Sequence, residues 1–270
     1  MPSQVLITGS GGRIGAAVAT ACATAGCTVI ATMRDVARGE ELFANCAGTV
    51  HVEQLDVAAP DTADKVSELL LKYGPIDVLV NNASIAVSGA FEEQSDRDVV
   101  DQIETNLIGM MTVTRALLPA MRAAGGGRIV GVSGIAGRVG VPALAPYSAT
   151  RHAVAGFCDA LRHEVAPFGI SVCLVEVGSL RTPVPGSHRR RGELTDHTGP
   201  YAPLNRAMER LLRDSSVDFG TVARKIAQLV LEPSPPFRTT VGGPALATAA
   251  LRNALPDALF ATGLRRLIGL

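Results

Sequence analysis

Residues 5–15 read Val-Leu-Ile-Thr-Gly-Ser-Gly-Gly-Arg-Ile-Gly, and this stretch decides the fold. Three apolar residues with strand character run into a glycine-rich turn, and an alanine-rich segment with helical character follows. A glycine-rich turn between a strand and a helix lets backbone N–H groups approach a pyrophosphate, whose charge the helix dipole stabilises. The stretch therefore predicts a dinucleotide-binding turn, and the alternative is a tight turn that binds nothing.

Short apolar runs alternate with longer helical stretches along the rest of the chain, which is typical of βαβ units and a parallel sheet. Strands are predicted near residues 4–9, 27–33, 49–56, 76–82, 128–133, 170–177 and 238–242. Helices are predicted over residues 13–25, 62–73, 96–124, 146–168 and 217–231. The whole chain, 1–270, is therefore expected to form one α/β domain with a Rossmann-like, doubly wound, seven-stranded parallel sheet and helices on both faces.

Residues 179–216 interrupt this alternation with four prolines and the basic run His188–Arg191. So long an irregular stretch in a compact domain is usually a lid or a binding loop, so we expect a substrate lid here. The basic run either binds an anionic substrate or acyl carrier, or belongs to a solvated lid. Residues 244–270 are expected to form a C-terminal helical tail that packs on the body or on a partner subunit, with a membrane surface as the alternative.

Composition narrows the class of function. Lys+Arg and Asp+Glu number 25 each, so a formal charge of +0 provides no general attraction to nucleic acid or to anionic membranes. The five cysteines include no C-x-x-C pair, which argues against a disulfide framework and against a metal site. Neither a basic signal-peptide region nor a run of 18 apolar residues occurs, so we expect a cytoplasmic protein without an integral membrane segment.

The end of the second predicted strand bears on the choice of dinucleotide. An acidic residue there would bind the ribose 2′-hydroxyl of NAD, whereas this chain has Met33 followed by the cation Arg34. Arg13, inside the glycine-rich turn, either adds a second cation near a 2′-phosphate or is a solvated residue at the start of the helix. We therefore expect NADP(H) in preference to NAD(H).

Several motifs, spaced in the right order, resemble those of the short-chain dehydrogenase/reductase family over about the first 185 residues. They are Thr8-Gly9 with Gly15, Asp56-Val57, Asn81-Asn82-Ala83, Thr105-Asn106-Leu107, Tyr147-x-x-x-Arg151 and Gly178-x-x-x-Thr182. Arg13 stands where many members have the middle glycine of the turn, and Gly12 can substitute for it. Taken with Arg34, the resemblance implies a cofactor site made of Thr8, Gly9, Gly12, Arg13, Ile14, Gly15, Arg34, Asp56, Val57, Asn82, Ala83, Tyr147, Arg151, Gly178 and Thr182.

The resemblance also implies a catalytic group. In the family a tyrosine is the acid or base for carbonyl–alcohol interconversion, a lysine holds the ribose and lowers the tyrosine pKa, and an asparagine, here Asn106, holds a water-linked proton path. Tyr147 and Arg151 stand at i and i+4 of a predicted helix and so share a face. A cation within about 4–6 Å lowers a phenol pKa by roughly 1–3 units. Arginine can supply that charge, although its planar fork is larger than an ammonium group.

Other positions depart from the family pattern. The serine that binds the substrate oxygen is replaced by Gly134, and its neighbour Ser133 would point to the opposite face of an extended strand unless a bulge turned it back. Loss of one donor to a developing oxyanion typically costs about 10²–10³ in rate. A donor from the lid would recover it. In addition, Ser84 stands where glycine is usual, and Val177 stands where proline is usual.

Two hypotheses of different kinds remain. The first is an NADP(H)-dependent oxidoreductase that interconverts a hydrophobic ketone and a secondary alcohol, with Tyr147 as acid/base, Arg151 at the ribose and Ser133 or a lid residue as helper. The second keeps the cofactor site without the redox step, as a cyclase, an isomerase, a dehydratase or a cofactor-binding protein without turnover. Halohydrin dehalogenases, which use a Ser-Tyr-Arg set and no nucleotide, fit poorly. The resemblance further implies a homodimer or homotetramer that pairs the helices of Asn106 and Tyr147.

Overall fold

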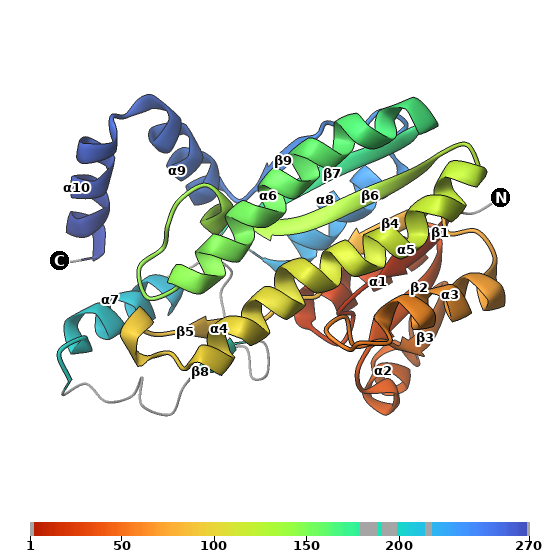
Figure 1. Ribbon diagram of the computed structural model, residues 1–270, viewed down its shortest axis with the longest axis horizontal. Helices are drawn as coiled ribbons and strands as arrows, with labels where there is room; N and C mark the ends of the chain where they lie inside the picture. The colour runs from red at the N-terminus through yellow and green to blue at the C-terminus, as the bar shows by residue number, and fades with distance from the viewer. Residues whose placement is uncertain (1–2, 179–187, 191–198, 214–217, 269–270) are drawn as a thin grey trace.

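A seven-stranded parallel sheet forms the middle layer of the protein, which confirms the predicted fold class. The computed structural model describes residues 3–178, 188–190, 199–213 and 218–268 (Figure 1). The sheet order is β3 (Thr49–Gln54), β2 (Thr28–Met33), β1 (Gln4–Ile7), β4 (Val78–Asn81), β6 (Gly127–Gly134), β7 (Ile170–Val177) and β9 (Arg238–Val241). Because the strand order runs outward in both directions from β1 and β4, the carboxyl ends of these strands form the switch point at which such sheets bind ligands.

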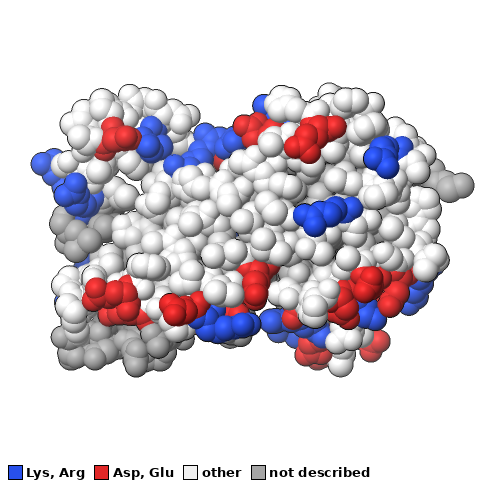
Figure 2. All heavy atoms as spheres, in the orientation of Figure 1, with Lys and Arg blue, Asp and Glu red and all other residues white. Residues whose placement is uncertain are grey.

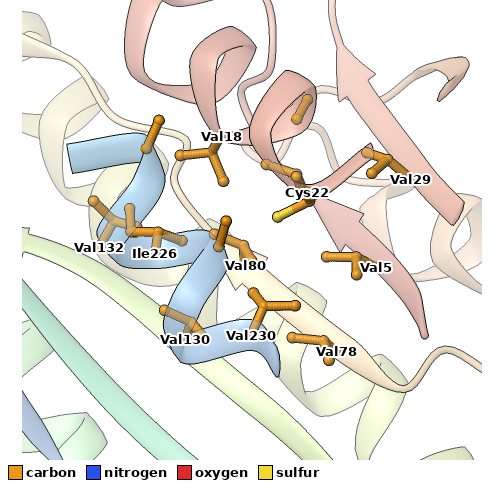
Figure 3. Close-up of a cluster of buried hydrophobic side chains, with 14 of the residues drawn as sticks. Val5, Val18, Cys22, Val29, Val78, Val80, Val130, Val132, Ile226 and Val230 are labelled. Carbon is orange, nitrogen blue, oxygen red and sulfur yellow. The ribbon is translucent and has the colours of Figure 1, made fainter. Parts of the chain in front are cut away.

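Helices cover both faces of the sheet and bury one core on each. One face carries α1 (Arg13–Thr24), α2 (Val36–Phe43) and α8 (Phe219–Leu231), and the other carries α3 (Thr62–Tyr73), α5 (Gly109–Ala123) and α6 (Ala145–Val165). Side chains alternate along each strand, so Val5 joins the first core while Leu6 joins the second. Figure 3 shows the first core, where strand valines meet Val18 and Cys22 of α1 and Ile226 of α8.

The predicted single helix over residues 96–124 is interrupted. It consists of α4 (Asp96–Ile103), a π-helical turn (Glu104–Ile108) and α5. Ser95 and Asp98 form a reciprocal capping box that begins α4. A π-helical turn adds one residue to the helical repeat, and such turns occur frequently at functional sites. Here the turn contains Asn106, which is only 1% exposed.

Three short elements were missed by the sequence pattern. The helix α2 begins where the Asp35 side chain accepts a hydrogen bond from the Arg38 backbone N–H at 3.1 Å. The strand β5 (Ala86–Ser88) pairs in parallel with β8 (His188–Arg190) in a separate two-stranded sheet. Neither short strand carries enough periodic residues to be recognised from the sequence alone.

The prediction that residues 179–216 are irregular throughout is wrong in two places. The strand β8 lies in the first half, and the helix α7 (Ala202–Arg213) lies in the second, where its buried side chains Asn205 and Met208 recur at helical spacing. Pro203 falls at the start of this helix, where its missing N–H costs nothing. Positions 179–187, 191–198 and 214–216 lie outside the described residues, and these include Thr182 and Arg191.

The C-terminal tail forms helices, as predicted. These are α9 (Gly243–Ala254) and α10 (Asp257–Ile268), and α10 lies beside α7 at one end of the molecule (Figure 1). Within the described ranges, no helix has both the length and the apolar character that a membrane crossing needs. Figure 2 shows that the face carrying α5 and α6 is largely uncharged across its middle, with acidic and basic residues gathered along its margins.

Candidate active site

The turn between β1 and α1 has the geometry of a phosphate cradle. Gly9 has φ +69°, and a Cβ atom there would lie 2.7 Å from the Cα of Ala83, so only glycine fits. A Cβ on Gly15 would lie 2.6 Å from Nδ2 of Asn82. The α1 helix begins at Gly12 without a side-chain cap and without an acidic residue in its first turn. Its first backbone N–H groups are therefore open to an anion.

Hydrogen bonds fix this turn to the end of β4. The Asn82 amide donates to the carbonyl oxygens of Thr8 at 2.9 Å and of Gly9 at 3.1 Å. In return, the Thr8 hydroxyl accepts from the backbone N–H groups of Asn82 at 3.0 Å and of Ala83 at 3.1 Å. These four predicted cofactor residues therefore lie together, and the cradle fits the pyrophosphate of a dinucleotide.

Two exposed arginines lie directly after the end of β2. Met33 is buried, and a Cβ on Gly11 would contact its side chain at 3.4 Å, whereas Arg34 is exposed. Arg38 is also exposed, and it lies in the first turn of α2. The sequence reasoning missed Arg38, although Asp35 as a helix-capping residue followed by Arg38 was a usable signal.

Other predicted cofactor residues lie at the same sheet edge. Asp56 follows β3 and accepts a hydrogen bond from the Ala58 backbone N–H at 3.1 Å, and Val57 is buried. Gly178 follows β7, and its N–H donates to the carbonyl of Val241 at 2.8 Å. Arg13 is exposed on the first turn of α1, with its guanidinium 5.6 Å from the centre of the Phe219 ring.

Tyr147 and Arg151 share a face of α6, as their spacing predicts. The Arg151 guanidinium carbon lies 4.7 Å from the centre of the Tyr147 ring. Arg151 is only 3% exposed, and it donates to the carbonyl of Val132 at 3.2 Å and to the hydroxyl of Ser84. Its Nε atom is buried and has no hydrogen-bond partner within the described parts of the chain. An unused buried donor beside the Tyr147 ring fits the hydroxyl groups of a ribose.

The end of β6 faces Tyr147 through Gly134. A Cβ atom built on Gly134 would lie 3.9 Å from the Tyr147 hydroxyl and 3.4 Å from the Val177 carbonyl, both ordinary contacts. The Ser133 hydroxyl lies instead 3.1 Å from a Cβ built on Gly137, and it is buried without a partner among the described residues. Ser133 would therefore reach a substrate oxygen beside Tyr147 only after a rearrangement of β6.

Asn106 connects the β4–β5 loop to α6. Its side-chain oxygen accepts from the Ile85 N–H at 2.8 Å, and its amide donates to the Ile85 carbonyl at 2.9 Å and to the Thr150 hydroxyl at 3.1 Å. The Thr150 hydroxyl in turn donates to the carbonyl of Tyr147 at 2.7 Å. Asn106 thus lies next to the predicted site. It is hydrogen-bonded to the Ile85 backbone of the β4–β5 loop and to Thr150, which lies between Tyr147 and Arg151 on α6.

Cysteine and metal chemistry have little support around this site. Burial raises the pKa of Cys22 and of Cys158 to about 12, and that of Cys173 to about 11, so these thiols stay protonated. Among the described residues, no group of His, Cys, Asp and Glu could hold a metal ion.

Comparison with known proteins identifies the family. The family model described as short chain dehydrogenase matches residues 3–192 of this chain. The chain belongs to the short-chain dehydrogenase/reductase family. An oxidoreductase named BOA17, from Botryotinia fuckeliana, is 36% identical over 246 residues, covering 87% of each chain. A 3-ketodihydrosphingosine reductase from Bacteroides thetaiotaomicron is 32% identical over 249 residues, covering 89% of this chain and 88% of the relative.

Solved structures of short-chain dehydrogenases have the same fold as this chain. One from Streptomyces avermitilis has a TM-score of 0.85 at 32% identity, covering 97% of this chain and 94% of that one. A variant of actinorhodin polyketide ketoreductase with NADPH has a TM-score of 0.75 at 30% identity, covering 90% and 97%. A Burkholderia phymatum member in complex with NAD has a TM-score of 0.79 at 24% identity, covering 93% of each chain. This short-chain dehydrogenase/reductase is thus an oxidoreductase whose structural neighbours hold NADP(H) or NAD.

Proposed function

We propose that this protein is an NADP(H)-dependent reductase or dehydrogenase that interconverts a hydrophobic ketone and its secondary alcohol, with Tyr147 as the acid or base. The observation that carries the proposal is the Tyr147 hydroxyl, which faces the open position above Gly134 while a buried guanidinium packs on its ring. The named relatives that reduce 3-ketodihydrosphingosine and polyketides support a hydrophobic carbonyl substrate.

Each part of the site has one role in cofactor binding or proton transfer. Backbone N–H groups at the start of α1 hold the pyrophosphate, and the unused Nε donor of Arg151 binds a ribose hydroxyl. The nicotinamide, when bound, supplies or accepts the hydride. In reduction, Tyr147 donates its phenolic proton to the substrate oxygen, and the Arg151 charge stabilises the negative oxygen left behind. In oxidation the same group accepts the proton.

The preference for NADP(H) rests on cations at the end of β2. Arg34, directly after β2, and Arg38, in the first turn of α2, are both exposed, at the strand end where the adenosine ribose binds in sheets of this topology. Guanidinium groups match a 2′-phosphate, and the nearest acid, Asp35, is engaged as the cap of α2. Arg13 is a third candidate cation, although its guanidinium lies on Phe219.

The substrate lid is proposed over residues 179–216. Its helix α7 packs Ala207 and Met208 against Ala143, which lies in the loop directly before α6. A lid that contacts this loop is in position to cover the space above Tyr147.

We further propose that the protein acts in the cytoplasm, because all five cysteines are free thiols.

A homodimer or homotetramer is proposed on the face of α4 and α6. An apolar hollow of about 500 Å³ lies there, between α4, the π-helical turn and the first half of α6. Its lining includes Phe91 and Ile103, which are 64% and 40% exposed. A hollow lined by exposed apolar side chains is the kind of surface that subunits bury.

A second candidate function is supported by the missing hydroxyl at Gly134. A protein of this kind would bind NADPH and use Tyr147 without hydride transfer, as an isomerase, a cyclase, a dehydratase or a cofactor sensor. The two are separated by titrating NADPH and NADH by fluorescence and then following NADPH absorbance across a panel of hydrophobic ketones. We expect saturable binding and turnover, and binding without any turnover would favour the second candidate.

A further inference from the structure

The Arg151 guanidinium is hydrogen-bonded to a side chain from outside its own helix. Its ring contact is Tyr147, one turn away on α6, and its backbone contact is the Val132 carbonyl on β6. Among the described residues, Ser84 is the only side chain that accepts a hydrogen bond from it. Ser84 lies in the β4–β5 loop, 67 residues before Arg151.

The backbone around Ser84 is fixed on both sides. The preceding N–H, of Ala83, donates to the Thr8 hydroxyl of the phosphate cradle at 3.1 Å. The following residue, Ile85, exchanges two hydrogen bonds with the buried Asn106 side chain, at 2.8 and 2.9 Å. The Ser84 hydroxyl is therefore presented to Arg151 from a rigid base, and it joins the cradle to the Tyr147 pair through one continuous series of contacts.

An arginine at this position needs such a partner. The guanidinium is planar and has five N–H donors, so its orientation decides which donors are left for a ligand. The hydrogen bond to the Val132 carbonyl fixes only one of these donors. The Ser84 hydroxyl supplies a second fixed point. A lysine ammonium is compact and rotates its donors freely, so it needs no second point.

We propose that Ser84 is a positioning residue that orients the Arg151 guanidinium against the Tyr147 ring and toward the cofactor ribose. The catalytic consequence rests on the proposed function, whereas the contact itself does not. The two residues act as a unit, so the Ser84 hydroxyl matters only while residue 151 is an arginine.

A double-mutant cycle tests this unit. Four proteins are compared: wild type, Ser84→Ala, Arg151→Lys and the double variant. NADPH dissociation constants are measured by fluorescence, and kcat and KM are measured with a ketone that the wild type reduces. We expect Ser84→Ala to raise the NADPH Kd about tenfold and to lower kcat about tenfold. In the Arg151→Lys background, the same change is expected to alter both by less than about twofold.

A matched control comes from the far end of the sheet. The Ser171 hydroxyl accepts a hydrogen bond from Nε of Arg128 at 3.1 Å. Ser171→Ala therefore also removes a serine hydroxyl that is hydrogen-bonded to a partly buried arginine. Ser171→Ala is expected to leave the NADPH Kd and kcat within about twofold of the wild type. Ser84→Gly is a second variant that removes the hydroxyl, and it differs from Ser84→Ala in the conformational freedom of the backbone.

The possible results distinguish the positioning role of Ser84 from the proposed ketone reduction. Equal effects of Ser84→Ala in both backgrounds would overturn the positioning role even if ketone turnover is normal. A cycle that couples in NADPH Kd without any ketone turnover would support the positioning role and defeat the redox function. A wild type that binds no NADPH would overturn both, and the urea midpoints of the four unliganded proteins would then report the contact alone.

Discussion

At the scale of single residues, the site depends on which way each side chain points from its element. The strand β6 ends in an extended conformation, with Gly134 at φ −147° and ψ 174°, so any residue could occupy that position. Gly134 faces the Tyr147 hydroxyl, and Ser133 faces Gly137. The vacancy beside Tyr147 is thus a missing side chain rather than a distorted backbone.

Gly134→Ser is expected to raise ketone reductase activity. A serine Cβ fits there without a close contact, and its hydroxyl would add a donor beside the Tyr147 oxygen. We expect kcat to rise about 10–100-fold with the NADPH Kd unchanged. Ser133→Ala is the control and should change kcat less than about twofold. An unchanged rate in Gly134→Ser would mean that another group already fills this role.

Sequence reasoning reached some of these residues and not others, for physical reasons. Strand alternation predicts that Ser133 points away from Gly134, and helical spacing predicts that Tyr147 and Arg151 meet. Both are local rules. The hydrogen bond from Arg151 to Ser84 joins residues of two different elements, and no local periodicity signals it.

At the scale of elements, the ends of strands and the starts of helices carry the site. The sequence predicted the seven sheet strands and the extent of α3, since their apolar periodicity is strong. It missed the π-helical turn at Asn106, because one inserted residue does not disturb helix propensity enough to be seen. It missed α2, whose eight residues are marginal as an isolated helix.

The junction of β2 and α2 is expected to select the cofactor. The double variant Arg34→Ala/Arg38→Ala should raise the NADPH Kd at least about tenfold, because the 2′-phosphate loses its charge-assisted hydrogen bonds to both guanidinium groups. The NADH Kd should change less than about twofold. Arg122→Ala, which removes an exposed arginine from the end of α5, is the control. Equal weakening for both nucleotides would contradict this role of the junction.

The carboxyl end of β7 is tied to its neighbours by a buried carboxylate. Glu176 is fully buried and accepts hydrogen bonds from Arg138 at 2.7 and 2.9 Å, from Arg238 at 2.6 Å and from Thr240 at 3.1 Å. These contacts join β7, β9 and the segment after β6. Both arginines are partly exposed, which moderates the cost of leaving them without their counter-charge.

Glu176→Gln is expected to lower the free energy of unfolding by about 2–4 kcal/mol, since it leaves two guanidinium groups facing a neutral amide. Urea denaturation would measure the loss. Glu68→Gln removes an exposed partner of Lys65 and should change the free energy of unfolding by less than about 1 kcal/mol. A loss from Glu176→Gln no larger than that from Glu68→Gln would show that the buried cluster is not a stabilising tie.

At the scale of the whole molecule, the switch point of the sheet positions the cradle. The face that carries α5 and α6 is largely uncharged across its middle (Figure 2). The parallel sheet follows from the alternating pattern of the whole chain, so it was predictable. How the tail helices lie on the body depends on contacts of α9 with β9 and of α10 with α7, which no sequence pattern contains.

Ile103→Arg is expected to reduce the assembly to monomers. The substitution places a charge in the apolar hollow between α4 and α6, which a partner subunit would have to bury. Sedimentation velocity would report the change in mass. Leu71→Arg, at an 88% exposed position on α3, is the control and should leave the assembly intact. A wild type that sediments as a monomer would remove the basis for this interface.

The phenol of Tyr147 is the centre of this account, and Tyr147→Phe tests it most directly. The variant removes one oxygen from a half-buried ring and leaves the cradle untouched. We predict an NADPH Kd within about twofold of the wild type and a loss of ketone reduction of at least about 100-fold, measured as NADPH oxidation. Ketone reduction that continues at the wild-type rate in Tyr147→Phe would contradict the account.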